Sequence, residues 1–170
     1  MDFSELAKSR FSCRKFKNIP VENEKIGKIL DVAIAAPTAK NVQPFKIWVA
    51  SSEDAIAKIK TITPAHFDAK LFFIVGGNSE QAFTRPYDNR NFEDVDATIV
   101  GTHIMLATYS LGLGSTWVGF FDEPELKKLF PEMMNYDIIG LFPTGYPADD
   151  AAPTERHFQR KTTSELVSFI

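Results

Sequence analysis

The sequence predicts a single domain of the α/β or α+β class, because segments with helical and with strand periodicity alternate along the whole chain. The chain has 170 residues, which is enough to bury a substantial core. Hydrophobic residues make up 44% and charged residues 24%, the balance of an ordinary globular protein. These observations place residues 1–170 in one domain.

Composition also excludes several classes of protein. The formal net charge is −3, whereas general nucleic-acid or anionic-membrane binders are usually basic. A single cysteine excludes an internal disulfide framework and favours a reducing compartment. The N-terminal residues have no signal-peptide pattern, and no stretch reaches the ~18 to 20 apolar residues of a membrane span. We therefore expect a cytoplasmic protein with no nucleic-acid or membrane partner.

The first half of the chain predicts two helices, then a strand, a helix and a buried strand. Residues 3–9 form a short helix, and a second helix starts at residues 20–24, where acidic residues favour the first turn. Its apolar face recurs at helical spacing until Pro37 stops the helix: Ile26, Ile29, Leu30 and Ala33. Residues 45–50 read as a strand and 53–60 as a helix. The apolar run 71–75, which precedes two glycines, predicts a central strand buried on both faces.

The second half centres on one long helix. Residues 81–91 predict a mobile surface segment, followed by a helix over 93–111 that Gly112 ends. Apolar residues cover nearly the whole circumference of this helix, so it should be buried on all sides, which indicates a dimer interface in so small a chain. The remaining expected elements are a short strand (115–118), a helix (123–130), a strand (138–144), a loop (148–156) and an apolar-periodic tail (164–170) that packs on a neighbour.

Arg10, Ser12 and Arg14 form the first candidate site. In an extended segment they share one face, and guanidinium forks beside a hydroxyl suit a phosphate. In a helix, Arg10 and Arg14 would instead stack at i,i+4 and repel, and a solvated basic patch would remain. Cys13 has basic neighbours that could lower its thiol pKa, but strand alternation turns it away from the other three.

Residues 37–44 form the second candidate site, a loop fixed at its entry and exit by prolines. Asn41 and Gln43 each carry donor and acceptor groups that can bind the edge of a heterocycle. The alternative is an Asn-capped turn between a helix and a strand.

Two later segments could complete a ligand site. In residues 112–122, Gly119 would let a backbone N–H approach a flat ligand, although a helix cap followed by a bulged strand explains the same pattern. Residues 156–161 could add cations to a phosphate site, or form a charged surface loop. The three histidines lack metal-ligand spacing, so no metal is expected. There is also no phosphate-binding glycine loop and no nucleophile elbow.

Together these segments resemble, in order, the sequence blocks of the nitroreductase family. The family's Arg-Arg-Ser-x-Arg-x-Phe stands here as Arg10-Phe11-Ser12-Cys13-Arg14-Lys15-Phe16. Its Ala-Pro-Ser-x-x-Asn-x-Gln-Pro-Trp stands as Ala36-Pro37-Thr38-Ala39-Lys40-Asn41-Val42-Gln43-Pro44-Phe45. Residues 112–119, 145–147 and 160–161 are similar to its later blocks. Residues 60–70 match none of the polar residues that some larger members place beside the flavin.

The resemblance implies an α+β three-layer sandwich, with a mixed central sheet flanked by helices, in an intertwined homodimer. It also implies FMN at the dimer interface and an enzyme that passes hydride from NADH or NADPH, through flavin N5, to a nitroaromatic, quinone or similar small acceptor. No catalytic side chain is then needed, because the flavin carries the chemistry. Arg14 would stabilise the negative charge of the reduced ring electrostatically.

The resemblance also assigns roles to individual residues. Arg10, Ser12 and Arg160 would hold the phosphate and ribityl chain, and the loop at residue 38 would come from the partner subunit. The implied cofactor-binding residues are Arg10, Phe11, Ser12, Arg14, Pro37, Thr38, Ala39, Asn41, Gln43, Trp117, Val118, Gly119, Phe120, Arg160 and Lys161.

Two alternatives remain open. One is a flavin-binding protein that stores, senses or modifies flavin, or takes electrons from a protein donor. The other is a domain without flavin, whose basic residues are only surface.

Overall fold

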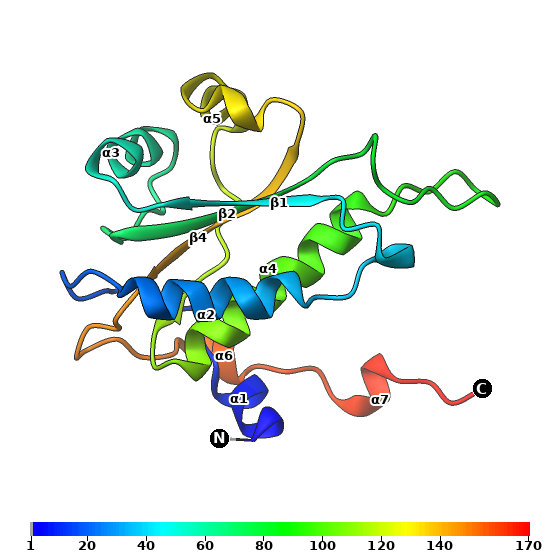
Figure 1. Cartoon of the computed structure of the whole chain (residues 1–170). Helices are drawn as coiled ribbons and strands as arrows, with labels where there is room; N and C mark the ends of the chain where they lie inside the picture. The colour runs from blue at the N-terminus through cyan, green and yellow to red at the C-terminus, as the bar shows by residue number, and fades with distance from the viewer. Residues whose placement is uncertain (1) are drawn as a thin grey trace.

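The computed structural model describes residues 2–170 and is an α+β sandwich of three layers, a sheet with helices on both faces (Figure 1). The helices are α1 (Phe3–Ser9), α2 (Asn23–Ile34), α3 (Glu53–Ile62), α4 (Glu93–Ser110), α5 (Glu123–Leu129), α6 (Glu155–Phe158) and α7 (Thr163–Leu166), with short 3₁₀ turns η1 (Ala39–Asn41) and η2 (Pro131–Met133). The strands are β1 (Phe45–Ala50), β2 (Leu71–Gly77), β3 (Gly114–Ser115) and β4 (Asp137–Gly145).

The sheet has the strand order β1-β2-β4-β3, and its named strands pair antiparallel. In the register of the central pair, Phe73 lies opposite Phe142. Among residues 2–170, a parallel pairing occurs only at the isolated bridge between Ser12 and Ser115. The predicted sandwich is therefore confirmed, and the expected parallel component of the mixed sheet is limited to this bridge at the β3 edge.

Strand β2 explains why the sheet needs helices on both faces. All of its residues are buried, as the apolar run predicts. Its side chains alternate between the two faces. Leu71, Phe73 and Val75 pack in the core that α2 and α4 cover, whereas Phe72 and Ile74 pack in the core under α3 and α5.

Helix α4 agrees with the predicted boundaries, but a single chain does not bury it on all sides. Gly112 follows its C-terminus at φ 75°, a left-handed conformation that favours glycine. One face is buried, and Asp94, Thr98 and Thr102 lie exposed on another. A third group of apolar side chains is only half-buried: Val95, Ile99, Met105 and Leu106. A single chain therefore leaves part of α4 uncovered, and burial of this half-buried surface by a second copy stays a prediction.

Several smaller expectations also need correction. The strand expected over 115–118 is interrupted: after Ser115, pairing resumes only at the bridge between Val118 and Leu141. Residues 81–91 fold back on themselves through a bridge between Thr84 and Asn91, although their side chains are mostly exposed. Helix α6 begins inside the expected loop. The tail 164–170 is exposed in the single chain, so its expected packing on a neighbour stays a prediction. No helix within residues 2–170 is long and apolar enough to cross a bilayer.

Trp117 interrupts the β3 segment because its ring packs into the core beside α4. Its indole N–H donates to the Ile139 carbonyl at 2.9 Å, and the ring meets Phe142 edge-on at 5.0 Å. A Cβ added at Gly140 would come within 2.5 Å of the indole nitrogen. The chain thus needs glycine at position 140 to seat this tryptophan.

We expect Gly140→Ala to destabilise the fold by about 1–3 kcal/mol, because the added methyl must displace a packed indole. Urea unfolding followed by circular dichroism measures this loss. Gly27→Ala is the matched control, because nothing lies within 4 Å of a Cβ there. Equal stability of both variants would contradict the proposed packing constraint.

Candidate functional site

The segment that follows α1 is extended, and this decides how its side chains point. Arg10 caps α1 with a non-helical backbone. The Cys13 N–H then donates to the Ser115 carbonyl at 3.0 Å, and the Lys17 N–H donates to the Tyr146 carbonyl at 2.8 Å. The segment is thus attached to β3 and to the residues after β4. Strand alternation, rather than the helical alternative, applies to Arg10, Ser12 and Arg14.

These three residues meet the C-terminal part of the chain at one cavity of about 220 Å³, which we call the arginine cavity. Its lining residues are Arg10, Phe11, Ser12, Arg14, Thr154, Arg156, His157 and Arg160. No acidic side chain is among them. The guanidinium of Arg160 is oriented by the carbonyls of Arg156 and Gln159, at 3.3 and 3.0 Å. Cations from both ends of the chain therefore converge on one small, strongly basic hollow.

The electrostatics of the arginine cavity favour an anion. Partial burial lowers the pKa of Arg10, and the nearby positive charge of Arg160 lowers it further. Within residues 2–170, no carboxylate forms an ion pair with either guanidinium. A bound anion would relieve both the desolvation and the repulsion, and a phosphate has the geometry that guanidinium forks prefer.

A second hollow of about 160 Å³, the Val118 cavity, begins where the first one ends. Arg14 lines both cavities. The other lining residues are Ala65, Phe67, Thr116, Trp117, Val118, Gly119 and Phe120. The Val118 N–H is used in the pairing with Leu141, but the N–H groups of Gly119 and Phe120 have no acceptor within residues 2–170. The two residues therefore line a site that joins a cationic end to an apolar end.

The connection between α3 and β2 also lines the Val118 cavity, and the sequence analysis missed it. The Thr63 hydroxyl donates to the Phe120 carbonyl at 2.5 Å, and the Asp122 N–H donates to the Ile62 carbonyl at 2.9 Å. These bonds hold the connection against the site and place Phe67 at its edge. The residue pattern of 60–70 contains no signal for this docking.

The loop that carries Pro37, Thr38, Ala39, Asn41 and Gln43 lines neither cavity. It follows α2 on a side of the molecule away from α1 and α6 (Figure 1). The Ala39 N–H donates to Asp96 at 2.9 Å, and the Gln43 N–H donates to the Thr38 hydroxyl at 3.0 Å. Asn41 and Gln43 have positive φ angles, so the loop is tightly shaped. Within one chain, this predicted half of the site stays apart from the other.

Three further residues differ from their expected environment. Lys161 lies beyond the arginine cavity, on an exposed surface that Phe158 and Glu165 share. The ring of Trp117 is used in the core, although the residue still lines the Val118 cavity. Cys13 is buried, and burial raises the pKa of its thiol instead of lowering it. The thiol packs against Gly114, where an added Cβ would come within 2.7 Å of the sulfur.

Comparison with known sequences identifies the family of this chain. The sequence profile of the nitroreductase family matches residues 7–70 and 63–146, which together cover most of the chain. The chain belongs to the nitroreductase family. The residues that carried the resemblance up to position 146 all lie inside this match, whereas Arg160 and Lys161 lie beyond it.

Individual relatives agree with this assignment. A Methanothermobacter thermautotrophicus protein named as an NADH dehydrogenase/NAD(P)H nitroreductase is 32% identical over 88% of this chain and 80% of its own length. The crystal structure of a nitroreductase family protein from Clostridium difficile 630 is 38% identical, covers 99% of this chain and 98% of its own, and superposes with a TM-score of 0.92. A nitroreductase from Exiguobacterium sibiricum 255-15, crystallised in complex with FMN, shares the fold at a TM-score of 0.85 and 19% identity, over 100% of this chain and 98% of its own.

Proposed function

We propose that this nitroreductase-family protein is an FMN-dependent oxidoreductase that passes hydride from NADH or NADPH to a small acceptor such as a nitroaromatic or a quinone. The single observation that carries the proposal is the arginine cavity, which joins the Val118 cavity at Arg14. An FMN molecule is likewise anionic at one end and flat at the other. The name of the Methanothermobacter relative supports a nicotinamide donor, and the FMN complex of the Exiguobacterium protein supports the same cofactor.

The residues present fit this cofactor. Arg10, Ser12 and Arg160 would hold the phosphate, because they supply donors without a competing carboxylate. The N–H groups of Gly119 and Phe120 would donate to the edge of the ring, and Phe67 and Phe120 would exclude water beside it. When bound, FMN supplies two-electron transfer between the nicotinamide donor and the acceptor. The chain itself then needs only to bind, orient and stabilise charge.

The site would be completed by a second copy of the chain in an intertwined homodimer. Thr38, Ala39 and Asn41 would enter from the partner, since their own chain keeps them away from both cavities. The half-buried side chains on α4 and the exposed apolar tail, with Leu166 and Phe169, support such an interface. Sedimentation of the purified protein tests this, and a stable monomer that binds FMN tightly would contradict it.

The decisive experiment for the proposed activity uses the absorbance of bound flavin. The protein should bind FMN with a yellow colour, and anaerobic addition of NADH or NADPH should bleach it within seconds. A nitroaromatic or quinone should then restore the colour. Bound FMN that neither nicotinamide bleaches would instead favour the second candidate, a protein that stores or senses flavin or takes electrons from a protein donor. Absence of bound FMN would reject both candidates.

Arg14 offers a prediction about charge stabilisation. We expect Arg14→Ala to make the bound flavin harder to reduce, lowering its midpoint potential by tens of millivolts, because a cation that stabilises the reduced ring is lost. Redox titration against dyes of known potential measures this. Arg14→Lys keeps the positive charge and should return the potential most of the way to the wild-type value. Lys15→Ala, next in sequence, serves as the control and should leave the potential unchanged. An unchanged potential in Arg14→Ala would rule out the role.

A further inference from the structure

A mostly apolar hollow beside α3 is separate from the flavin site proposed above. This α3 cavity has a volume of about 470 Å³, in the range of small-molecule sites. It lies between α3, the end of β1, the start of β2 and the segment that leads into α2. None of its lining residues lines the arginine cavity or the Val118 cavity. The proposed flavin chemistry leaves it unused.

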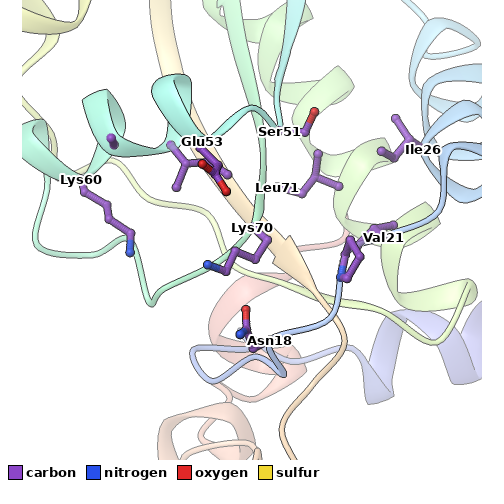
Figure 2. Close-up of a pocket in the computed structure, with 11 residues that line it drawn as sticks. Asn18, Val21, Ile26, Ser51, Glu53, Lys60, Lys70 and Leu71 are labelled. Carbon is purple, nitrogen blue, oxygen red and sulfur yellow. The ribbon is translucent and has the colours of Figure 1, made fainter.

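The walls of the α3 cavity are apolar. Ile56 of α3 and Leu71 of β2 are buried, and Val21 and Ile26 are half-buried on the opposite side. In Figure 2, Val21 and Ile26 lie across the hollow from Glu53 and Lys70. A ligand therefore meets an aliphatic surface on one side and charged groups on the other.

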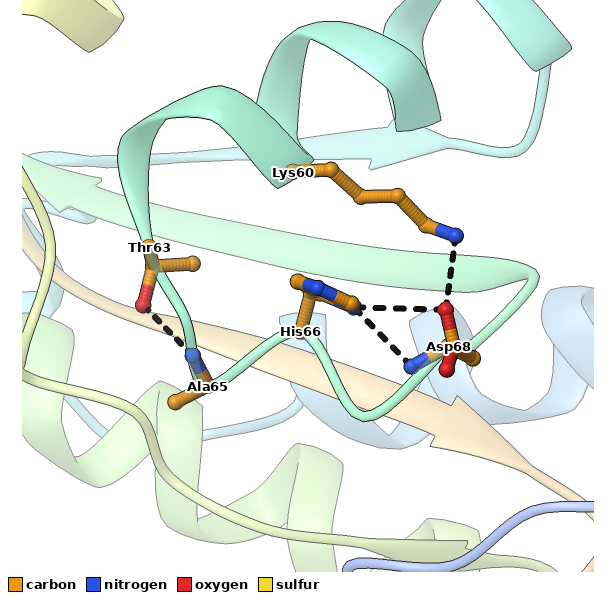
Figure 3. A network of polar contacts seen from close by, with 5 residues as sticks. All are labelled: Lys60, Thr63, Ala65, His66 and Asp68. Carbon is orange, nitrogen blue, oxygen red and sulfur yellow. Dashed lines mark hydrogen bonds and ion pairs between the residues drawn. The ribbon is translucent and has the colours of Figure 1, made fainter.

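Two lysines line the α3 cavity, Lys60 and Lys70, and Lys60 already forms an ion pair. Its ammonium forms an ion pair with the Asp68 carboxylate at 2.8 Å. The backbone N–H of Asp68 donates to His66 Nδ1 at 3.1 Å, which helps to fix the position of Asp68 (Figure 3). The Lys60 hydrogen bond is the main cause of the lowered pKa of Asp68, and Lys70 adds to it only at longer range. Lys60 thus has its counter-ion, whereas Lys70 forms no ion pair within residues 2–170.

Glu53 and Lys70 are the unpaired charges of the cavity. Neither forms an ion pair within residues 2–170, with each other or with any other group. Both are exposed, and Figure 2 shows them on the same side of the hollow. A free carboxylate and a free ammonium, facing one apolar space, match a small molecule that carries both charges and an aliphatic body.

We propose that the α3 cavity binds a free α-amino acid with an apolar side chain. Lys70 receives the carboxylate, Glu53 receives the ammonium, and the side chain packs between Val21, Ile26 and Leu71. An aliphatic carboxylate would pair with Lys70 but leave Glu53 without a partner. An aliphatic amine would pair with Glu53 but leave Lys70 without one. Only the zwitterion satisfies both charged groups.

Isothermal titration of the full chain with L-leucine tests the ligand class. Leucinamide removes the carboxylate, and 4-methylpentanoate removes the ammonium. We expect each to bind about tenfold more weakly than leucine, because a charge-assisted contact is lost in each case. No binding of leucine, or equal binding of either analogue, would overturn the proposal.

Variants then locate the site. Lys70→Gln and Glu53→Gln should each weaken leucine binding about tenfold, and Ala57→Leu should abolish it by filling the hollow from the exposed side of α3. Lys46→Gln, on an exposed position of β1 outside the cavity, should bind leucine like the wild type. FMN binding serves as the check of folding for every variant. Leucine binding that survives Lys70→Gln and Ala57→Leu would place the ligand elsewhere and refute the assignment.

Discussion

Arg10→Ala should weaken FMN binding by about 10- to 100-fold, because a partly buried guanidinium can form a charge-assisted contact with phosphate of that strength. Arg160→Ala should act in the same direction. The stability of the flavin-free protein should not follow the affinity. Burial, and then repulsion by Arg160, lower the pKa of Arg10, so Arg160→Ala should leave the flavin-free fold no less stable than the wild type. Titration of flavin fluorescence measures the affinities, and thermal unfolding measures the stabilities.

Salt and a matched variant separate this effect from a general loss of charge. Lys8→Ala removes a cation from α1, close in sequence but outside the arginine cavity, and should leave FMN affinity unchanged. Raising the salt concentration should weaken FMN binding to the wild type more than to Arg10→Ala, because fewer charges contribute in the variant. If Arg10→Ala bound FMN like the wild type, the arginine cavity would not hold the phosphate.

The second large effect concerns pH and Glu93, which is buried at the start of α4. Burial, and then the neighbouring carboxyl of Asp137, raise the pKa of Glu93 from 4.5 to about 7. The folded state thus holds this proton more tightly than the unfolded chain does. Its contribution to stability is complete below pH 4.5 and is lost as the pH rises to about 7, a loss on the order of 1–3 kcal/mol.

Glu93→Gln should remove this pH dependence, because glutamine keeps the shape of the side chain and cannot ionise. Urea unfolding at pH 5 and at pH 8 should show a fall in wild-type stability and a much smaller one in the variant. Asp94→Asn, at the exposed neighbouring position, is the control and should keep most of the wild-type fall, because the charge of Asp94 is only a lesser cause of the raised pKa of Glu93. An equal fall in Glu93→Gln would assign the titration to another group.

Local patterns were sufficient to predict most of the fold. The apolar run at β2 and the cap at Gly112 each define an element through short-range chemistry, and the structure confirms both. The failures involve partners that the local pattern does not contain. The strand after β3 breaks because Trp117 finds an acceptor at Ile139, far along the chain. Burial of α4 on all sides stays a prediction, because a single chain covers only one of its faces.

For the candidate site, the sequence predicted some of the lining residues and missed others. Arg10, Ser12 and Arg14 were correctly placed together by strand alternation, and the family resemblance added Arg160 from the far end of the chain. Thr63 and Phe67 were missed because their role depends on a hydrogen bond to the carbonyl of Phe120, which no residue pattern encodes. The loop at Thr38 remains a prediction, since its proposed contact lies across two chains.

The packing of Trp117 also gives the protein an optical reporter at its own site. The chain has two tryptophans, and the other, Trp48, packs edge-on against Tyr136 in the opposite core, under α3 and α5. Trp117 is adjacent to Val118, at the hollow where the flat part of a flavin would rest. The fluorescence of the two tryptophans should therefore respond differently to a bound flavin. Trp117 should be quenched when the Val118 cavity is filled, and Trp48 should be quenched much less. A Trp48→Phe protein would report occupancy of this one cavity without any added label.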